Sequence, residues 1–99
     1  MLRFIKVTGD SLSPEFEKGD FVLVSKIPFS LSSIREGDTV VFKHNQYGTL
    51  IKKVAILYPE NQEYFVVGTH GHSVDSRRFG NVPRKDLLGK VIWHIRRPR

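Results

Sequence analysis

A Gly-Asp step followed by an apolar run occurs twice in the chain, as Gly19-Asp20-Phe21-Val22-Leu23-Val24 and as Gly37-Asp38-Thr39-Val40-Val41-Phe42. Glycine suits tight corners because it adopts backbone angles that other residues avoid. β-Branched and aromatic residues favour strands, where their side chains pack on a pleated surface. Each stretch therefore predicts a tight corner that leads directly into a β-strand.

Short strands separated by turns are predicted along the rest of the chain as well. Three more apolar runs have the length and composition of strands, at 50–57, 64–67 and 88–95. A hairpin turn is expected at Asn45-Gln46-Tyr47-Gly48, and a short helical turn with Ser13 as N-cap and Pro14 at its first position. No segment keeps a 3.6-residue apolar period over ten positions. The sequence predicts one mostly-β domain over residues 1–99, a small coiled, barrel-like sheet with few short helical turns.

The composition limits the classes of protein to which the chain can belong. Its 99 residues, 39% of them apolar, suffice for one small core. Cysteine is absent, which excludes a disulfide framework and any cysteine-based metal site. No apolar run approaches the ~20 residues that span a bilayer, and residues 1–7 lack the apolar run of a signal peptide. The chain as given is predicted to be soluble, in the cytoplasm or at the periphery of a membrane.

The charge is strongly positive, because sixteen Lys and Arg against ten Asp and Glu give +6. This balance favours anionic partners and allows association with an acidic membrane surface. No recognition-helix pattern, zinc-finger spacing or aromatic RNA-binding motif accompanies the charge, so nucleic acid is not predicted as a partner. His70 and His72 could supply two metal ligands, but no third is evident nearby, so no metal or other cofactor is predicted. His44 and His94 are isolated in the sequence.

Ser11 is the candidate nucleophile. It lies in Gly9-Asp10-Ser11-Leu12, which spells the signature of the GDSL esterases. Those enzymes have a larger α/β fold and complete a triad with a downstream Asp-x-x-His pair, which this sequence lacks. A serine hydroxyl also needs a base to take its proton. On the tetrapeptide alone, a turn or cap serine is the favoured interpretation.

A lysine on an apolar strand is the candidate base. Alternation along 49–56 places four side chains on one face of the strand: Leu50, Lys52, Val54 and Ile56. An amine among apolar groups loses solvation of its charged form, so its pKa falls and it can act as a base. Lys53 shares the other face with Ile51 and Ala55, and the pattern prefers Lys52 only mildly. A strand lysine that extends to solvent fits the same pattern.

Asp75 and Arg77 lie two positions apart in a polar segment that also holds Ser73 and Ser76. A carboxylate and a guanidinium at this spacing can form a charge-assisted pair that fixes a turn. Pairs of this kind are common on protein surfaces and contribute little energy there. By itself the segment predicts only a polar loop.

Taken in order, five segments resemble the sequence boxes of the signal peptidase I family and its wider clan, which includes the LexA-type repressors. The segments are 9–14 with 19–24, then 37–42, 51–54, 73–82 and 89–91. The first is similar to Gly-x-Ser-Met-x-Pro followed by Gly-Asp, and the fourth to Ser-x-Asp-Ser-Arg-x-(Phe/Trp)-Gly-x-Val. From the first to the last, they span residues 9–91. The resemblance implies the fold of the LexA C-terminal domain and a serine-type peptidase with a Ser/Lys dyad.

The resemblance assigns a catalytic role to each motif residue. Ser11 would be the nucleophile and Lys52, in its neutral form, the general base, which settles the choice between Lys52 and Lys53. Ser73 would hydrogen-bond the lysine amine and orient it. The backbone N–H of Ser11 would help to stabilise the oxyanion of the tetrahedral intermediate.

The same resemblance assigns supporting roles to four further residues, and two positions differ from the family's usual sequence. Asp75 and Arg77 would pair to hold their loop beneath the site. Leu12 and Leu50 would line an apolar pocket for a small substrate side chain. Leu12 replaces the usual methionine, an apolar exchange. Gly9 stands where some bacterial signal peptidases have a serine that supplies a second oxyanion donor.

The short chain, with its Phe-Gly-x-Val and Gly-Lys-Val segments, resembles the compact proteases that trim the leader of nickel superoxide dismutase. The implied function is a serine endopeptidase that cleaves a leader or signal peptide from a precursor protein. The substrate would bind as an extended strand beside the segment leading to Ser11 and the strand bearing Lys52. One alternative is a LexA-like autoproteolytic domain, for which ten residues before Ser11 leave little room. Another is a non-catalytic peptide-binding module of the same fold.

Overall fold

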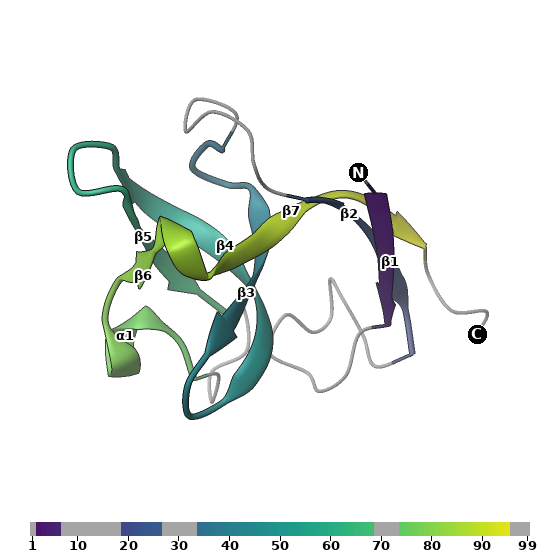
Figure 1. Ribbon diagram of the computed structural model, residues 1–99, viewed down its shortest axis with the longest axis horizontal. Helices are drawn as coiled ribbons and strands as arrows, with labels where there is room; N and C mark the ends of the chain where they lie inside the picture. The colour runs from purple at the N-terminus through teal and green to yellow at the C-terminus, as the bar shows by residue number, and fades with distance from the viewer. Residues whose placement is uncertain (1, 7–18, 27–33, 69–73, 96–99) are drawn as a thin grey trace.

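The computed structural model describes residues 2–6, 19–26, 34–68 and 74–95. Within these residues, seven strands form one antiparallel sheet in the order β1-β2-β7-β3-β4-β5-β6 (Figure 1). The strands are β1 (Leu2–Lys6), β2 (Phe21–Lys26), β3 (Thr39–His44), β4 (Gly48–Tyr58), β5 (Glu63–Val67), β6 (Val82–Pro83) and β7 (Leu87–Ile95). A short helix, α1 (Ser76–Phe79), and a 3-10 turn, η2 (Arg84–Asp86), complete the described elements.

The prediction of a mostly-β fold is confirmed. All five predicted strands are present, as β2, β3, β4, β5 and β7, and the predicted turn joins β3 to β4. Gly48 ends this turn with a φ of +77°, a value that favours glycine. The strands β1 and β6 are additions that the apolar runs do not predict. The expected helical turn at Ser13 and Pro14 lies outside the described residues.

The sheet curls, and each of its faces covers an apolar cluster. The long strand β7 joins the two halves, because it pairs with β3 near its beginning and with β2 towards its end (Figure 1). The larger cluster consists of Ile34, Val40, Phe42, Val54, Tyr64, Val66, Val82 and Leu87. The smaller cluster consists of Val22, Val24 and Val41, with Ile5, Ile51, Leu88 and Val91 packed against it. The neighbours Val40 and Val41 belong to different clusters, as the alternation of side chains along a strand requires.

The glycines of the two Gly-Asp corners have the same φ angle, and both corners are attached to β7. Gly19 and Gly37 each have a φ of +95°, which favours glycine. Each aspartate pairs with a basic side chain on β7: Asp20 with His94 at 2.7 Å and Asp38 with Lys90 at 3.1 Å. The Asp20 side chain is fully buried. His94, which stands alone in the sequence, therefore has a buried partner 74 positions away.

Gly89 allows β7 to pass close to β2. A Cβ atom at this position would collide with the carbonyl oxygen of Ser25. The two residues that follow also make structural contacts, since Lys90 pairs with Asp38 and Val91 packs against the smaller cluster. Through its Gly-Lys-Val segment, β7 therefore contacts both β2 and the corner before β3.

Candidate active site

The candidate base, Lys52, is buried in the middle of β4, with only 1% of its surface exposed. The register of β3 and β4 pairs it with Val40, and Val54 lies two positions further along the same face. Both valines belong to the larger cluster. The lysine stem therefore lies on an apolar face, where water cannot fully solvate an ammonium group.

The prediction that Ile56 shares this face is wrong. The register of β4 with β5 shifts between Val54 and Ile56, and such a bulge disrupts the alternation of the side chains that follow. Ile56 is 41% exposed, and Leu57 packs against the larger cluster instead. Lys53 is only partly buried. Of the two adjacent lysines, the structure buries Lys52.

Asp75 caps α1 and accepts four hydrogen bonds. Its Oδ1 accepts from the backbone N–H and from Nε of Arg77, both at 3.0 Å. Its Oδ2 accepts from Arg77 Nη2 at 2.7 Å and from the Gly68 N–H at 2.9 Å. The Asp75 side chain is 1% exposed, whereas that of Arg77 is 59% exposed. The two side chains do form an ion pair, but it is more than a surface pair because its acidic partner is buried.

The surroundings of Asp75 favour its charged form. Burial acts to raise the carboxyl pKa, but the hydrogen bonds from Arg77 and Gly68 outweigh it and hold this pKa below the usual 3.8. The hydrogen bond to Asp75 in turn raises the pKa of the Arg77 guanidinium. Gly68 precedes the segment that carries Ser73, and Asp75 follows it. The Gly68–Asp75 hydrogen bond therefore ties together the two ends of that segment.

Ser76 attaches the same turn to the sheet. Its buried Oγ accepts a hydrogen bond from the Val66 N–H of β5 at 2.9 Å. Val66 pairs with Val54 of β4, two positions beyond Lys52. The turn that follows Ser73 and the strand that bears Lys52 are therefore both attached to β5. Ser11, Leu12 and Ser73 themselves lie outside the described residues, so their assigned roles stay predictions.

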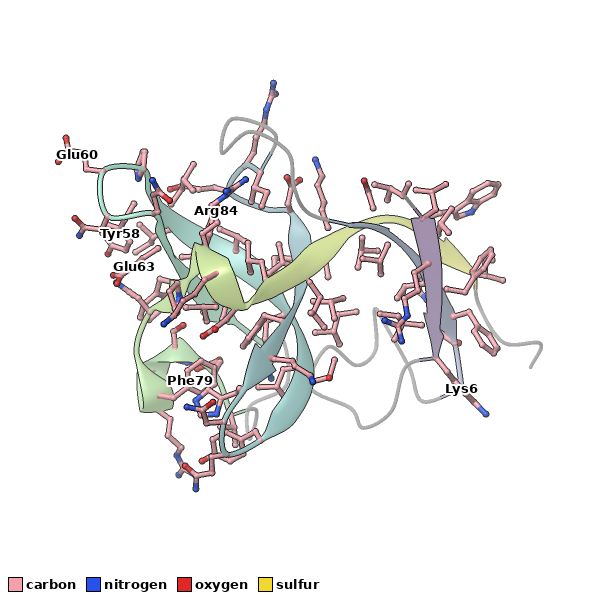
Figure 2. All side chains as sticks on the ribbon, in the orientation of Figure 1. Lys6, Tyr58, Glu60, Glu63, Phe79 and Arg84 are labelled. Carbon is pink, nitrogen blue, oxygen red and sulfur yellow. The ribbon has the colours of Figure 1, made fainter. Side chains whose placement is uncertain are left out.

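A cavity of about 570 Å³ lies between β1 and the first half of β4. Its lining residues are Arg3, Ile5, Lys6, Val22, Val41, Lys43, Thr49, Leu50, Ile51 and Leu88. Leu50, the predicted pocket residue, is among them. Figure 2 shows Lys6 at the end of β1, five positions before Ser11 in the sequence. The cavity is thus bordered by the strand that leads to Ser11 and by the strand that carries Lys52, although the Lys52 side chain itself lies on the other face of β4, beside Val40 and Val54.

The described part of the chain holds no group of three His, Cys, Asp or Glu side chains that could bind a metal. His44 has a structural role, because its Nδ1 accepts from the N–H groups of Gln46 and Tyr47 at 3.0 and 3.3 Å. Its ring centroid lies 4.6 Å from that of Phe79. Residues 70–72 lie outside the described residues. None of the described helices has the length and hydropathy needed to cross a membrane.

Two comparisons with known proteins agree with this arrangement. Residues 1–91 match a family model described as Peptidase S24-like. Signal peptidase I V of Bacillus subtilis (strain 168) is 37% identical over 99 aligned positions, which cover 85% of this chain and 59% of the relative. The chain thus spans less than two thirds of that relative's length. Because the family model covers nearly the whole chain, we conclude that the chain belongs to the Peptidase S24-like family.

Proposed function

We propose that the chain is a serine endopeptidase in which Ser11 is the nucleophile and Lys52 the general base. The observation that carries the proposal is the burial of Lys52, with 1% of its surface exposed, on the apolar face of β4. Simple peptide binding has no need of a buried amine, and burying one is costly. A base must also be neutral to accept a proton, which such burial favours.

The proposed reaction uses one amine as base and then as acid. Lys52 Nζ takes the proton of Ser11 Oγ while Oγ attacks the carbonyl carbon of the substrate, and the backbone N–H of Ser11 stabilises the oxyanion. The carbon–nitrogen bond then breaks, and the Lys52 ammonium gives its proton to the departing amine. A water molecule hydrolyses the acyl-enzyme in the same way, with Lys52 again as the base. Ser73 positions the amine by a hydrogen bond.

The buried Asp75 supports the placement of Ser73. It bonds to Gly68 on one side of the segment that carries Ser73 and to Arg77 on the other. A segment held at both ends loses less conformational freedom when the substrate binds. We expect Asp75 and Arg77 to act as positioning residues that touch neither the substrate nor the reacting atoms.

The proposed substrate is a leader or signal peptide that binds in extended form. β1 is the terminal strand in the described sheet order, and an edge strand can accept a further strand by main-chain hydrogen bonds. The cavity beside it would take alternate side chains of that peptide, with Leu50 in contact with a small apolar residue. Leu12 would complete this contact.

The direct test is cleavage of a precursor peptide by the Ser11→Ala variant. Ser25→Ala is a matched control, because Ser25 lies on β2 in the described sheet and has no assigned role. We expect Ser11→Ala to form no product by mass spectrometry and Ser25→Ala to cleave at close to the wild-type rate. Undiminished cleavage by Ser11→Ala would rule out the proposed nucleophile.

We also propose that the protein associates with an anionic membrane surface. The strand register places five large apolar side chains on one face of β1, β2 and β7, and each is between 42% and 65% exposed: Leu2, Phe4, Phe21, Trp93 and Ile95. The strand register places Phe4 and Trp93 on opposite sides of Leu23 in the same row. Aromatic side chains on an apolar face, combined with a net charge of +6, suit the interface of an anionic bilayer.

The single tryptophan of the chain makes this association measurable. We expect the fluorescence of Trp93 to shift to shorter wavelength with phosphatidylglycerol vesicles and to shift less with phosphatidylcholine vesicles. Phe4→Ser should weaken the shift, whereas Phe65→Ser, on β5 and away from this face, should not. An unchanged spectrum with both kinds of vesicle contradicts the association.

A further inference from the structure

The cavity beside β1 and β4 has an apolar floor and a cationic rim. Its floor consists of Ile5, Val22, Val41, Ile51 and Leu88. Three basic residues also line it: Arg3 and Lys6 from β1, and Lys43 from β3. The side chain of Lys6 leaves β1 on the face opposite to Arg3 and Ile5, so Arg3 and Lys43 supply the charge that faces the floor. No aspartate or glutamate is among its described lining residues. The cavity therefore combines an apolar surface with a local excess of positive charge.

Among the described residues, no carboxylate is found in an ion pair with these cations. In the part of the chain that the structure describes, the ion pairs found join Asp20 to His94, Asp38 to Lys90 and Asp75 to Arg77. None of them involves Arg3, Lys6 or Lys43. All three of these side chains are exposed, so they remain hydrated and can exchange water for an incoming anion at little cost.

Arg3 and Lys43 lie on two sides of the apolar floor. Arg3 lies two positions from Ile5 on β1, so both side chains leave the strand on the same face. Lys43 pairs across strands with Thr49 of β4, whose side chain is also exposed. A ligand in the cavity would therefore contact apolar side chains at its centre and a basic side chain on either side.

We infer that this cavity selects peptide segments in which acidic side chains flank an apolar residue. The inference rests on the proposed endopeptidase function and names a substrate class for it. In an extended peptide, successive side chains point to opposite faces. An apolar residue can then contact the floor while carboxylates two positions before and after it reach Arg3 and Lys43.

The size of the selectivity follows from the exposure of these cations. A solvent-exposed ion pair changes an affinity by about 1.4- to fivefold. Two such pairs, to Arg3 and Lys43, should make an acidic peptide bind roughly fivefold more tightly than its uncharged analogue. Salt screens exposed ion pairs, and the Debye length falls from about 14 Å at about 0.05 M salt to about 4 Å at about 0.5 M. The preference for the acidic peptide should therefore fall strongly over this range.

Peptide binding to the Ser11→Ala variant tests the inference without cleavage. The probes are three fluorescein-labelled peptides with one apolar sequence and with Asp, Asn or Lys at the same two positions, which flank the apolar residue. We expect fluorescence anisotropy to give the tightest binding for the Asp peptide and the weakest for the Lys peptide. The Arg3→Glu/Lys43→Glu variant should reverse this order. Arg78→Glu/Lys85→Glu changes the net charge equally but lies outside the cavity lining, and it should keep the wild-type order.

Three results would overturn the inference. The first is equal affinity for the Asp and Asn peptides, and the second is no binding of any peptide. The third is the same loss of preference in both double variants, which would mean that net charge and not the cavity attracts the acidic peptide. The proposed function is tested separately, because wild-type cleavage of the Asn peptide depends on the dyad and not on this preference.

Discussion

Replacement of Asp75 by alanine should destabilise the fold far more than replacement of an ordinary surface carboxylate. Loss of the helix cap costs about 1 kcal/mol, and loss of the acceptor for the Gly68 N–H costs about another 1 kcal/mol. The ion pair itself adds little, because Arg77 is 59% exposed and becomes hydrated when its partner is removed. We therefore expect the free energy of unfolding to fall by about 2 to 3 kcal/mol.

Urea unfolding followed by circular dichroism measures this change. Glu60→Ala is the matched control, since Glu60 is exposed at the turn between β4 and β5 and points into solvent (Figure 2). Its replacement should change the free energy of unfolding by less than about 0.5 kcal/mol. If Asp75→Ala is as mild as Glu60→Ala, the Asp75 hydrogen bonds do not hold this turn and the reasoning fails.

Asp75 also makes the free energy of unfolding depend on pH in the acid range. The pKa of the Asp75 carboxyl is lower in the folded protein than its usual value of 3.8, so the unfolded chain binds the proton more readily. The contribution of the Asp75 carboxylate to the free energy of unfolding is complete at pH values above its usual pKa. This contribution is lost as the pH falls through the lower pKa of the folded state. The difference in stability between the wild type and Asp75→Ala should therefore be constant near neutral pH and shrink below about pH 4. A difference that grows in acid contradicts this assignment.

Three further outcomes are expected. Gly89→Ala should destabilise the fold by about 2 kcal/mol or more in urea unfolding, because its Cβ would collide with the Ser25 carbonyl of β2; a neutral effect would mean that β7 can move away freely. Asp20→Ala should cost about 1 to 3 kcal/mol in the same assay, because it leaves His94 without its buried acceptor, and a loss below 0.5 kcal/mol would contradict this. The rate of peptide cleavage, kcat/KM, should rise with pH as the Lys52 amine loses its proton; a flat profile between pH 6 and 10 would exclude that role for it.

The strands were predictable where local pattern and tertiary burial agree. The Gly-Asp corners precede β2 and β3 as expected, because glycine at a φ of +95° is needed at both. β1 was missed because two of its apolar residues, Leu2 and Phe4, face outward and form no buried stripe. Ile56 was assigned to the wrong face because a bulge is a property of two paired strands, and the sequence of one strand does not reveal it.

The candidate site was predictable only in part, for a related physical reason. Alternation placed Lys52 on an apolar face, but only the sheet register establishes that it is buried while Lys53 is partly exposed. The Asp75–Arg77 pair joins residues two positions apart and could be foreseen. The hydrogen bond from the Gly68 N–H to the buried Asp75 carboxylate could not. The pairing of Asp20 with His94 depends on the long-range contact of β2 with β7, and nothing local indicates it.

The general base is tested most directly by comparing two adjacent lysines in one cleavage assay. Lys52→Met and Lys53→Met each remove an amine and keep a side chain of similar length, and circular dichroism confirms that each variant is folded. On one leader peptide we predict that kcat/KM falls at least about a hundredfold for Lys52→Met and by less than about threefold for Lys53→Met. Equal losses in the two variants, or full activity of Lys52→Met, would contradict the role of the buried Lys52 as the base.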